Sequence, residues 1–201
     1  DQAAALAEGG ADVLWIETIS STEEYAAAVA GAAATGLPVV GTMTFDTNGR
    51  TMMGVTPEDA ASFAQSLSPG VHGYGCNCGV GPATLIDTVL GLRKMAADTD
   101  IIVAKGNCGI PEYVDGEIAY SGSPEIMAAY AKLARRAGAR IIGGCCGTTA
   151  IHLKAIKQAL DGYEPEAAPS REEIEATLGP IDQPKPQPDG SECRRRHRRR
   201  G

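Results

Sequence analysis

Short apolar runs alternate along the chain with longer segments in which apolar residues recur at helical spacing. The runs are nearly continuous, which is typical of strands buried on both faces of a parallel sheet. Strands are predicted at residues 11–16, 38–43, 71–76, 100–104 and 139–142, and helices at 22–34, 56–67, 81–97, 123–138, 149–160 and 171–178. Successive strands start 27, 33, 29 and 39 residues apart. This spacing predicts an α/β fold built from βα units.

Five βα units fit either an open doubly wound sheet or part of an eight-unit barrel. No Gly-x-Gly-x-x-Gly fingerprint follows the first strand, where Trp15-Ile16-Glu17-Thr18 stands instead, and this disfavours a dinucleotide-binding fold. Residues 1–10 have the pattern of a helix end stopped by glycines. We therefore expect that an N-terminal piece of the domain precedes Asp1.

The order of the pattern fades near the C-terminus. Residues 163–201 are predicted to hold a short helix at 171–178, followed by a Pro-rich and then Arg-rich tail that we expect to be disordered. The folded domain is accordingly expected at residues 1–162.

The charge is unevenly distributed along the chain. The formal net charge is −7, and six arginines lie within residues 194–200, so the rest of the chain carries −7 − 6 = −13. An acidic body argues against nucleic acid as the main partner. The basic tail could bind an acidic surface or RNA, or it could simply keep the protein in solution.

Composition also bears on where the protein works. No apolar run approaches 18 residues, so no membrane span is expected. The six cysteines do not form the framework of a small secreted domain. A reducing cytoplasm, in which thiolates bind metal, fits these features.

Chemically capable residues follow each of the five predicted strands. They are Glu17 and Thr18, Asp46, Asn77 and Cys78, Asn107 and Cys108, and Cys145 and Cys146. In a parallel αβ barrel the active site lies at the C-terminal ends of the strands. We therefore expect these residues to lie around one site.

The adjacent cysteines in Gly143-Gly144-Cys145-Cys146-Gly147 are candidate metal ligands, with Cys78 as a third. Three sulfurs on Zn²⁺ leave one tetrahedral position open for chemistry. The glycines allow the tight turn that aims successive side chains at one point. Three alternatives stay open: buried cysteines without metal, redox-active thiols, and a closed structural site in which Cys76 is the fourth ligand.

Two further residues are candidates for substrate binding. Glu17 ends an apolar strand, where its carboxylate needs a partner. That partner could be the ammonium group of an amino-acid substrate or a cation in a neighbouring element. Asn77 could hold a substrate carboxylate or amine, or could cap its loop.

The remaining candidates have simpler interpretations. His72 lies at a strand start and His152 on a helix, so both are interpreted as structural. Cys108 is expected near the site without being a ligand, and Cys193 is expected to be a free thiol in the tail.

Three motifs together resemble the homocysteine S-methyltransferase family. They are Trp15-Ile16-Glu17-Thr18, Asn77-Cys78 and Gly143-Gly144-Cys145-Cys146-Gly147-Thr148, and residues 41–46 and 49–54 strengthen the resemblance. The similarity covers about residues 1–162 and is greatest to the betaine-dependent bacterial members.

The resemblance implies a zinc-dependent (βα)8 TIM-type barrel and a homocysteine S-methyltransferase enzyme. This chain would hold the last five units of the barrel, and those units alone are expected to be unstable, aggregation-prone or inactive. It implies Cys78, Cys145 and Cys146 as zinc ligands, and Glu17 and Asn77 at the site of L-homocysteine. The substrates would be homocysteine and a small methyl donor, with betaine expected and a methylfolate- or cobalamin-type donor as the alternative. A homo-oligomer is possible for the full-length enzyme.

Overall fold

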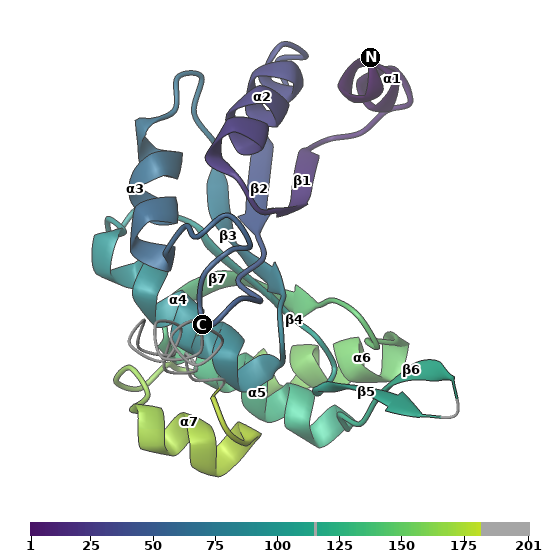
Figure 1. Cartoon of the computed structure of the whole chain (residues 1–201), viewed down its shortest axis with the longest axis vertical. Coiled ribbons are helices and arrows are strands. Elements are labelled where there is room, and N and C mark those ends of the chain that lie inside the picture. The colour runs from purple at the N-terminus through teal and green to yellow at the C-terminus, as the bar shows by residue number, and fades with distance from the viewer. Residues whose placement is uncertain (115, 182–201) are drawn as a thin grey trace, which may run out of the picture.

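The computed structural model describes residues 1–114 and 116–181, and its centre is a sheet of five parallel strands in the order β1-β2-β3-β4-β7 (Figure 1). The strands are β1 (Leu14–Ile19), β2 (Val39–Met43), β3 (Gly73–Cys78), β4 (Ile102–Gly106) and β7 (Ala139–Gly144). The helices are α1 (Gln2–Glu8), α2 (Thr22–Ala33), α3 (Pro57–Ser66), α4 (Pro82–Met95), α5 (Pro124–Arg136), α6 (Ala150–Leu160) and α7 (Arg171–Leu178). The predicted α/β fold with a parallel sheet is confirmed.

The helices begin where the sequence places capping residues. The side chains of Ser21, Thr56 and Ser123 accept hydrogen bonds from backbone N–H groups three residues on, at the starts of α2, α3 and α5. Proline follows the cap in α3 and α5, where its missing N–H costs nothing. These local signals explain why the helix boundaries were predictable within a few residues.

One element was not predicted from the sequence. Between β4 and α5 the chain forms an antiparallel hairpin of β5 (Pro111–Val114) and β6 (Glu117–Tyr120). Short, mixed-polarity strands of four residues carry little periodic signal. The hairpin matters for the site because it contacts the loop that follows β7.

The boundaries of the strands also differ from the prediction. β3 ends at Cys78 rather than at residue 76, and β7 ends at Gly144 rather than at residue 142. The longer strands place Asn77 and Cys78 inside the sheet. The short helix at 171–178 is confirmed as α7, whereas the predicted disordered tail at 182–201 lies outside the described residues.

One face of the sheet, here called the helix face, is covered by α2 to α5. Tyr74 donates a hydrogen bond to Asp100 and receives one from Gln65 of α3, and the Cys76 thiol lies against the Leu85 carbonyl of α4. Tyr25 of α2 lies so close to Gly41 that a Cβ there would come within 2.3 Å of its hydroxyl. The helix face is therefore close-packed.

The opposite face, here called the inner face, carries Trp15, Glu17, Thr42, Asn77 and Lys105. Lys105 of β4 forms an ion pair with Glu17 of β1, although β2 and β3 lie between them. Neighbouring strands are about 4.8 Å apart, so these strands would be about 14 Å apart in a flat sheet. Side chains that stand up from a flat sheet would not meet over that distance, so the sheet curves toward its inner face.

Candidate metal centre

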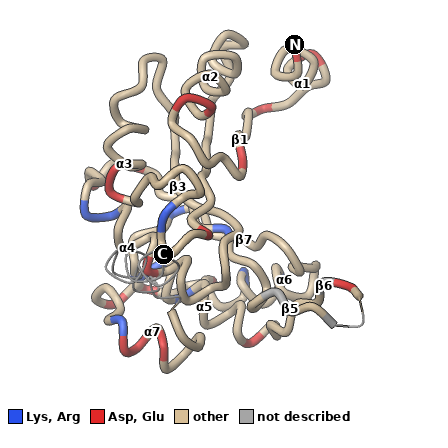
Figure 2. Tube along the Cα trace, in the orientation of Figure 1, with Lys and Arg blue, Asp and Glu red and all other residues tan. Residues whose placement is uncertain are grey.

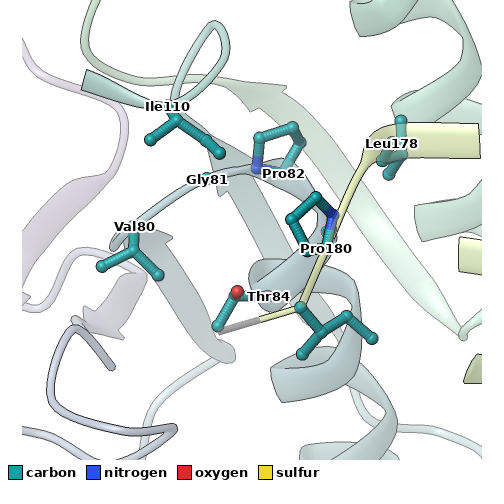
Figure 3. A pocket seen from close by; sticks show the side chains of 9 residues that line it. Val80, Gly81, Pro82, Thr84, Ile110, Leu178 and Pro180 are labelled. Carbon is teal, nitrogen blue, oxygen red and sulfur yellow. The ribbon is translucent and has the colours of Figure 1, made fainter. Parts of the chain in front are cut away.

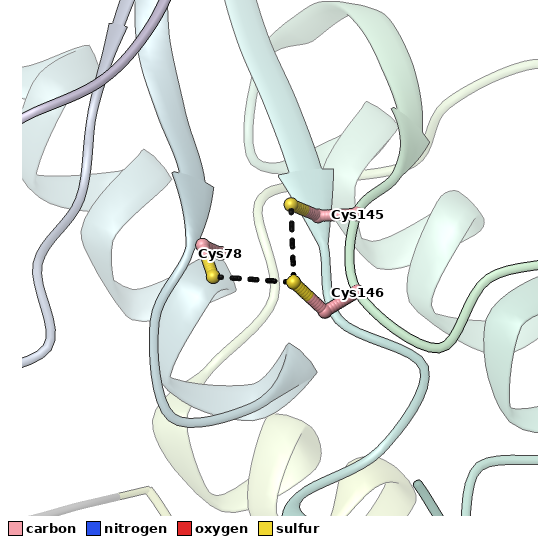
Figure 4. A group of neighbouring side chains, drawn as sticks. All are labelled: Cys78, Cys145 and Cys146. Atoms are coloured by element: carbon pink, nitrogen blue, oxygen red, sulfur yellow. Dashed lines mark hydrogen bonds between the residues drawn. The ribbon is translucent and has the colours of Figure 1, made fainter. Parts of the chain in front are cut away.

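Three cysteine thiols meet at the C-terminal ends of β3 and β7 (Figure 4). The Sγ atom of Cys146 lies 3.8 Å from that of Cys78 and 3.9 Å from that of Cys145. All three Sγ atoms lie within 4.8 Å of one another, and no other group of three potential metal ligands occurs among the described residues. The structure thus brings Cys78, Cys145 and Cys146 together across 66 intervening residues.

Backbone geometry at the end of β3 aims Cys78 at the other two cysteines. Residues two apart in a regular strand face the same side, so Cys78 would follow Cys76 onto the helix face. Instead Cys78 has φ 61°, in the left-handed region that non-glycine residues rarely adopt. Such a conformation costs of order 1–3 kcal/mol and is typical of functional sites. This turn separates Cys78 from Cys76.

The loop after β7 has its own special position. Gly147 has φ 74°, and a Cβ there would lie 2.4 Å from Cγ of Tyr120, on strand β6. A residue with a side chain would therefore be strained and would also displace the hairpin. The glycine after the cysteine pair lets the loop turn tightly beneath Tyr120.

Asn107 joins the two halves of the cysteine cluster. Its Nδ2 donates to the carbonyl of Gly79 at 2.8 Å, and its Oδ1 accepts from the N–H of Cys146 at 3.1 Å. Asn107 is buried. It thereby fixes the loop after Cys78 relative to Cys146. The sequence places Asn107 after a predicted strand but does not indicate this role.

The three thiols fit a soft divalent ion such as Zn²⁺. With Zn–S bonds of about 2.3 Å and tetrahedral angles, two sulfurs on one zinc ion lie about 3.8 Å apart. The separations of Cys146 Sγ from Cys78 Sγ and from Cys145 Sγ, 3.8 and 3.9 Å, match that value. Cys146 is exposed to solvent, which leaves one side of the cluster open to a further ligand.

Cys76 does not join the cluster. Its thiol is fully buried on the helix face and lies 3.8 Å from the carbonyl of Val103. Burial raises the pKa of Cys76 far above the usual value of a thiol. The closed four-sulfur alternative needs Cys76 beside the other sulfurs, and the structure does not place it there.

The electrostatics of the cluster call for a cation. Burial, together with the neighbouring Cys145 and Cys146, raises the pKa of the Cys78 thiol to about 11 and so favours its protonated form. Three thiolates so close together would repel one another without a positive charge between them. A bound metal ion supplies that charge and keeps its thiol ligands deprotonated.

Asn77 directly precedes Cys78, and both the oxygen and the nitrogen of its side-chain amide have hydrogen-bond partners. Its Oδ1 accepts from Thr42 Oγ1 at 2.8 Å and from the N–H of Thr18 at 3.1 Å. Its Nδ2 donates to Thr18 Oγ1 at 2.7 Å and lies 3.9 Å from Cys145 Sγ. Asn77 is 1% exposed, so in this structure it positions β1 relative to Cys145.

Thr18 repeats the geometry of Cys78 on a second strand. It has φ 65°, and the register between β1 and β2 shifts between Ile16 and Ile19. The left-handed turn lets Thr18 bond Asn77 from the inner side although Glu17, the preceding residue, also lies on the inner face. Two strained strand ends therefore meet at Asn77.

Glu17 and Lys105 lie on the inner face next to this network. Both side chains are partly exposed, 35% for Glu17 and 24% for Lys105. The Lys105 ammonium also lies 5.2 Å from the ring centroid of Trp15. Of the two partners considered for Glu17, the structure shows a cation of the protein itself, Lys105 of β4.

The histidines and Cys108 have local structural contacts. His72 accepts a hydrogen bond from the N–H of Val39, and His152 accepts one from the N–H of Thr149 at the start of α6. The Cys108 thiol donates to the carbonyl of Gly122. None of the three belongs to the cysteine cluster, and Cys193 lies outside the described residues.

A separate apolar pocket of about 300 Å³ lies at the N-terminal end of α4 (Figure 3). No titratable side chain lines it, so it offers shape without acid–base or metal chemistry. The lining residues are Val80, Gly81, Pro82, Ala83, Thr84, Ile110, Leu178, Pro180 and Ile181.

Acidic and basic residues are interspersed along α3, α4 and α7 in the described part of the chain (Figure 2). Within the described residues, no helix is both long enough and apolar enough to cross a lipid bilayer.

Comparison with known proteins gives a consistent result. The family model described as Homocysteine S-methyltransferase matches residues 1–160. Betaine--homocysteine S-methyltransferase 1 of Danio rerio is 31% identical to this chain over 175 residues. The alignment covers 78% of this chain but 43% of the Danio rerio protein, so the chain spans less than half the length of that relative.

Proposed function

The chain belongs to the homocysteine S-methyltransferase family, a family of methyltransferase enzymes, and on that premise we propose that it methylates L-homocysteine at a zinc site. The observation that carries the proposal is the cluster of Cys78, Cys145 and Cys146 with sulfur separations of a tetrahedral zinc site. Bound Zn²⁺ would stabilise a coordinated thiolate at neutral pH, where a free thiol with a pKa of about 8.5 is mostly protonated.

The chain's own residues prepare this reaction in three ways. The three cysteines leave one side open, on which the homocysteine sulfur would lie after its proton has passed to solvent. Asn107 and Asn77 hold the strand ends that carry the cysteines. Glu17 offers a carboxylate on the inner face for the substrate's ammonium group.

Methyl transfer then needs no general base. The homocysteine sulfur forms a new bond to the methyl carbon, and the bond from that carbon to the donor breaks with its electron pair staying on the donor. With betaine the products are methionine and dimethylglycine. The protein's contribution is to hold sulfur and methyl carbon about 3–3.5 Å apart and in line.

The fold, donor and setting are part of the proposal. We propose that the five βα units belong to a (βα)8 barrel, which the curvature of the sheet supports, and that residues 1–162 form its last five-eighths. We propose betaine as the donor because the resemblance and the name of the relative point to it. A cytoplasmic location and a homo-oligomer for the complete enzyme are proposed on the family resemblance alone.

A donor competition assay tests the proposed function. The zinc-loaded complete enzyme, with the barrel units proposed to precede this chain, would be given L-homocysteine with methyl-labelled betaine or with methyl-labelled methyltetrahydrofolate, and labelled methionine would be measured by mass spectrometry. We expect labelled methionine from betaine. Labelled methionine from methyltetrahydrofolate alone would overturn betaine as the donor, and a complete, zinc-loaded enzyme that forms no methionine with either donor would overturn the proposed reaction.

A further inference from the structure

The ion pair between Glu17 and Lys105 is an unusual feature of the inner face. Each charge is partly exposed, and the two residues come from strands separated by β2 and β3. The ammonium of Lys105 has a second partner in the indole ring of Trp15, 5.2 Å away. A cation held by both a carboxylate and an aromatic face can leave one partner without becoming isolated.

The pair lies next to the sulfur cluster. Glu17 directly precedes Thr18, which exchanges two hydrogen bonds with Asn77, and the Asn77 amide lies 3.9 Å from Cys145 Sγ. Lys105 is aligned with Asn77 on one side and with Gly143 on the other, two residues before Cys145. A ligand whose sulfur sits at the cysteines would therefore extend along the inner face toward both charges.

An α-amino acid carries an ammonium and a carboxylate on one carbon, so a site for it needs one negative and one positive group. Glu17 and Lys105 are those two groups, already desolvated in part by their mutual contact. When the amino acid binds, the Glu17–Lys105 ion pair is replaced by two ion pairs between the protein and the ligand. No charge is then left unpaired, and buried charges are tolerated only when they are paired. A ligand with only one of the two charges would leave Glu17 or Lys105 without its partner.

We propose that Lys105 is a specificity-determining residue that binds the carboxylate of the amino-acid thiol. Without substrate, Lys105 neutralises Glu17. When substrate binds, its ammonium takes the Glu17 carboxylate, and Lys105, held against Trp15, takes the substrate carboxylate. The inference rests on the proposed function, because it places a homocysteine sulfur at the cysteine cluster.

Three thiols of matched length separate the two charges in a binding test. L-Homocysteine carries both, 3-aminopropane-1-thiol lacks the carboxylate, and 4-sulfanylbutanoate lacks the ammonium. Trp15 is the only tryptophan of the chain and contacts Lys105, so its fluorescence reports movement of Lys105. Titrations on zinc-loaded protein would give the three affinities, with zinc content measured separately by a chromophoric chelator.

Lys105→Met keeps the apolar stem and removes the charge. We expect it to lower the affinity for L-homocysteine by about tenfold or more, which is the usual contribution of a charge-assisted hydrogen bond. 3-Aminopropane-1-thiol should bind as well as before or better, because Glu17 is freed. Lys105→Arg should restore most of the preference for L-homocysteine. Lys157→Met, which removes a lysine paired with Asp161 on the surface of α6, is the control and should change nothing.

The outcomes separate this inference from the proposed function. A wild-type preference for L-homocysteine that collapses in Lys105→Met and returns in Lys105→Arg supports it. If Lys105→Met lowers the affinity for L-homocysteine and for 3-aminopropane-1-thiol equally, or lowers neither, Lys105 is only structural. Either result would overturn the inference, while the proposed function stands. Protein that binds neither zinc nor any of the thiols would overturn the proposed function itself.

Discussion

The two faces of the sheet are built from the same five strands but differ in their packing and chemistry. On the helix face, side chains such as Cys76 and Ala104 are fully buried under α4 and α5. The inner face carries the Glu17–Lys105 ion pair and the hydrogen bonds of the Asn77 side-chain amide, and three thiols lie at its strand ends. The comparison shows that one face supplies stability while the other holds the groups that can react.

Cys76 and Cys78 illustrate the difference at closest range. They are two residues apart on β3 and would face the same side of a regular strand. The left-handed backbone at Cys78 sends its thiol to the cluster, whereas the Cys76 thiol stays buried under α4. The packing of the helix face therefore stabilises the strained backbone at Cys78, and this backbone conformation places the Cys78 thiol in the cluster.

The largest expected effect comes from replacing each of these two cysteines with alanine in separate variants. Cys78→Ala should reduce zinc content from one ion per chain to nearly none, because it removes one of three ligands. Cys76→Ala should keep the zinc and lower the free energy of unfolding by about 1–2 kcal/mol, because it leaves a small cavity under α4. Zinc analysis and thermal denaturation check both. Loss of zinc in Cys76→Ala would contradict the separation of the two faces.

A smaller effect is expected at Asn107, which lies between the two strand ends. Asn107→Ala removes both hydrogen bonds that hold the cysteine loops, and residues of this kind typically change metal affinity by 10–100-fold. Asn107→Asp keeps the acceptor for the Cys146 N–H and loses the donor to Gly79, so its loss should be smaller. Chelator competition measures both affinities. An Asn107→Ala variant that binds zinc as tightly as the wild type would show that the loops need no such link.

The smallest effect concerns pH and the zinc-free protein. Because folding raises the pKa of Cys78 from its reference of 9.0 to about 11, the folded state holds this proton more tightly than the unfolded state. The stabilisation is fully present below about pH 9 and is lost as pH rises toward 11. Zinc-loaded protein should lack this decline, because its thiols are already deprotonated.

Ionisation of other buried thiols and phenols also destabilises the folded protein at high pH, so a matched comparison is needed. Urea unfolding of zinc-free wild type and zinc-free Cys78→Ala between pH 8 and 11 isolates the contribution of Cys78. We expect the wild type to lose more stability across this range. Parallel curves for the two proteins would mean that Cys78 is not perturbed by its surroundings.

The sequence carries strong signals for the fold and for the ligands but weak ones for their support. Apolar runs and capping residues predict the parallel sheet and its helices because both depend on local chemistry. Cys145 and Cys146 stand out because two adjacent thiols among glycines are rare. The left-handed turns at Thr18 and Cys78 could not be predicted, since they arise where strands end against one another.

The roles of Lys105 and Asn107 also depend on long-range geometry. Lys105 directly follows an apolar run, and its partner Glu17 is 88 residues away. The curvature that joins them belongs to the whole sheet and not to any segment. Asn107 resembles an ordinary loop residue until the ends of β3 and β7 come together. The same holds for β6, because the close approach of its Tyr120 to Gly147 has no counterpart in the periodicity of the sequence.

X-ray absorption at the zinc edge tests the central claim most directly, namely that three thiols on the inner side leave one coordination position for a substrate sulfur. Without homocysteine, we expect three sulfur ligands and one light atom. After addition of L-homocysteine, we expect four sulfurs at about 2.3 Å. Four sulfurs before any addition, or three sulfurs that do not change after it, would contradict the account.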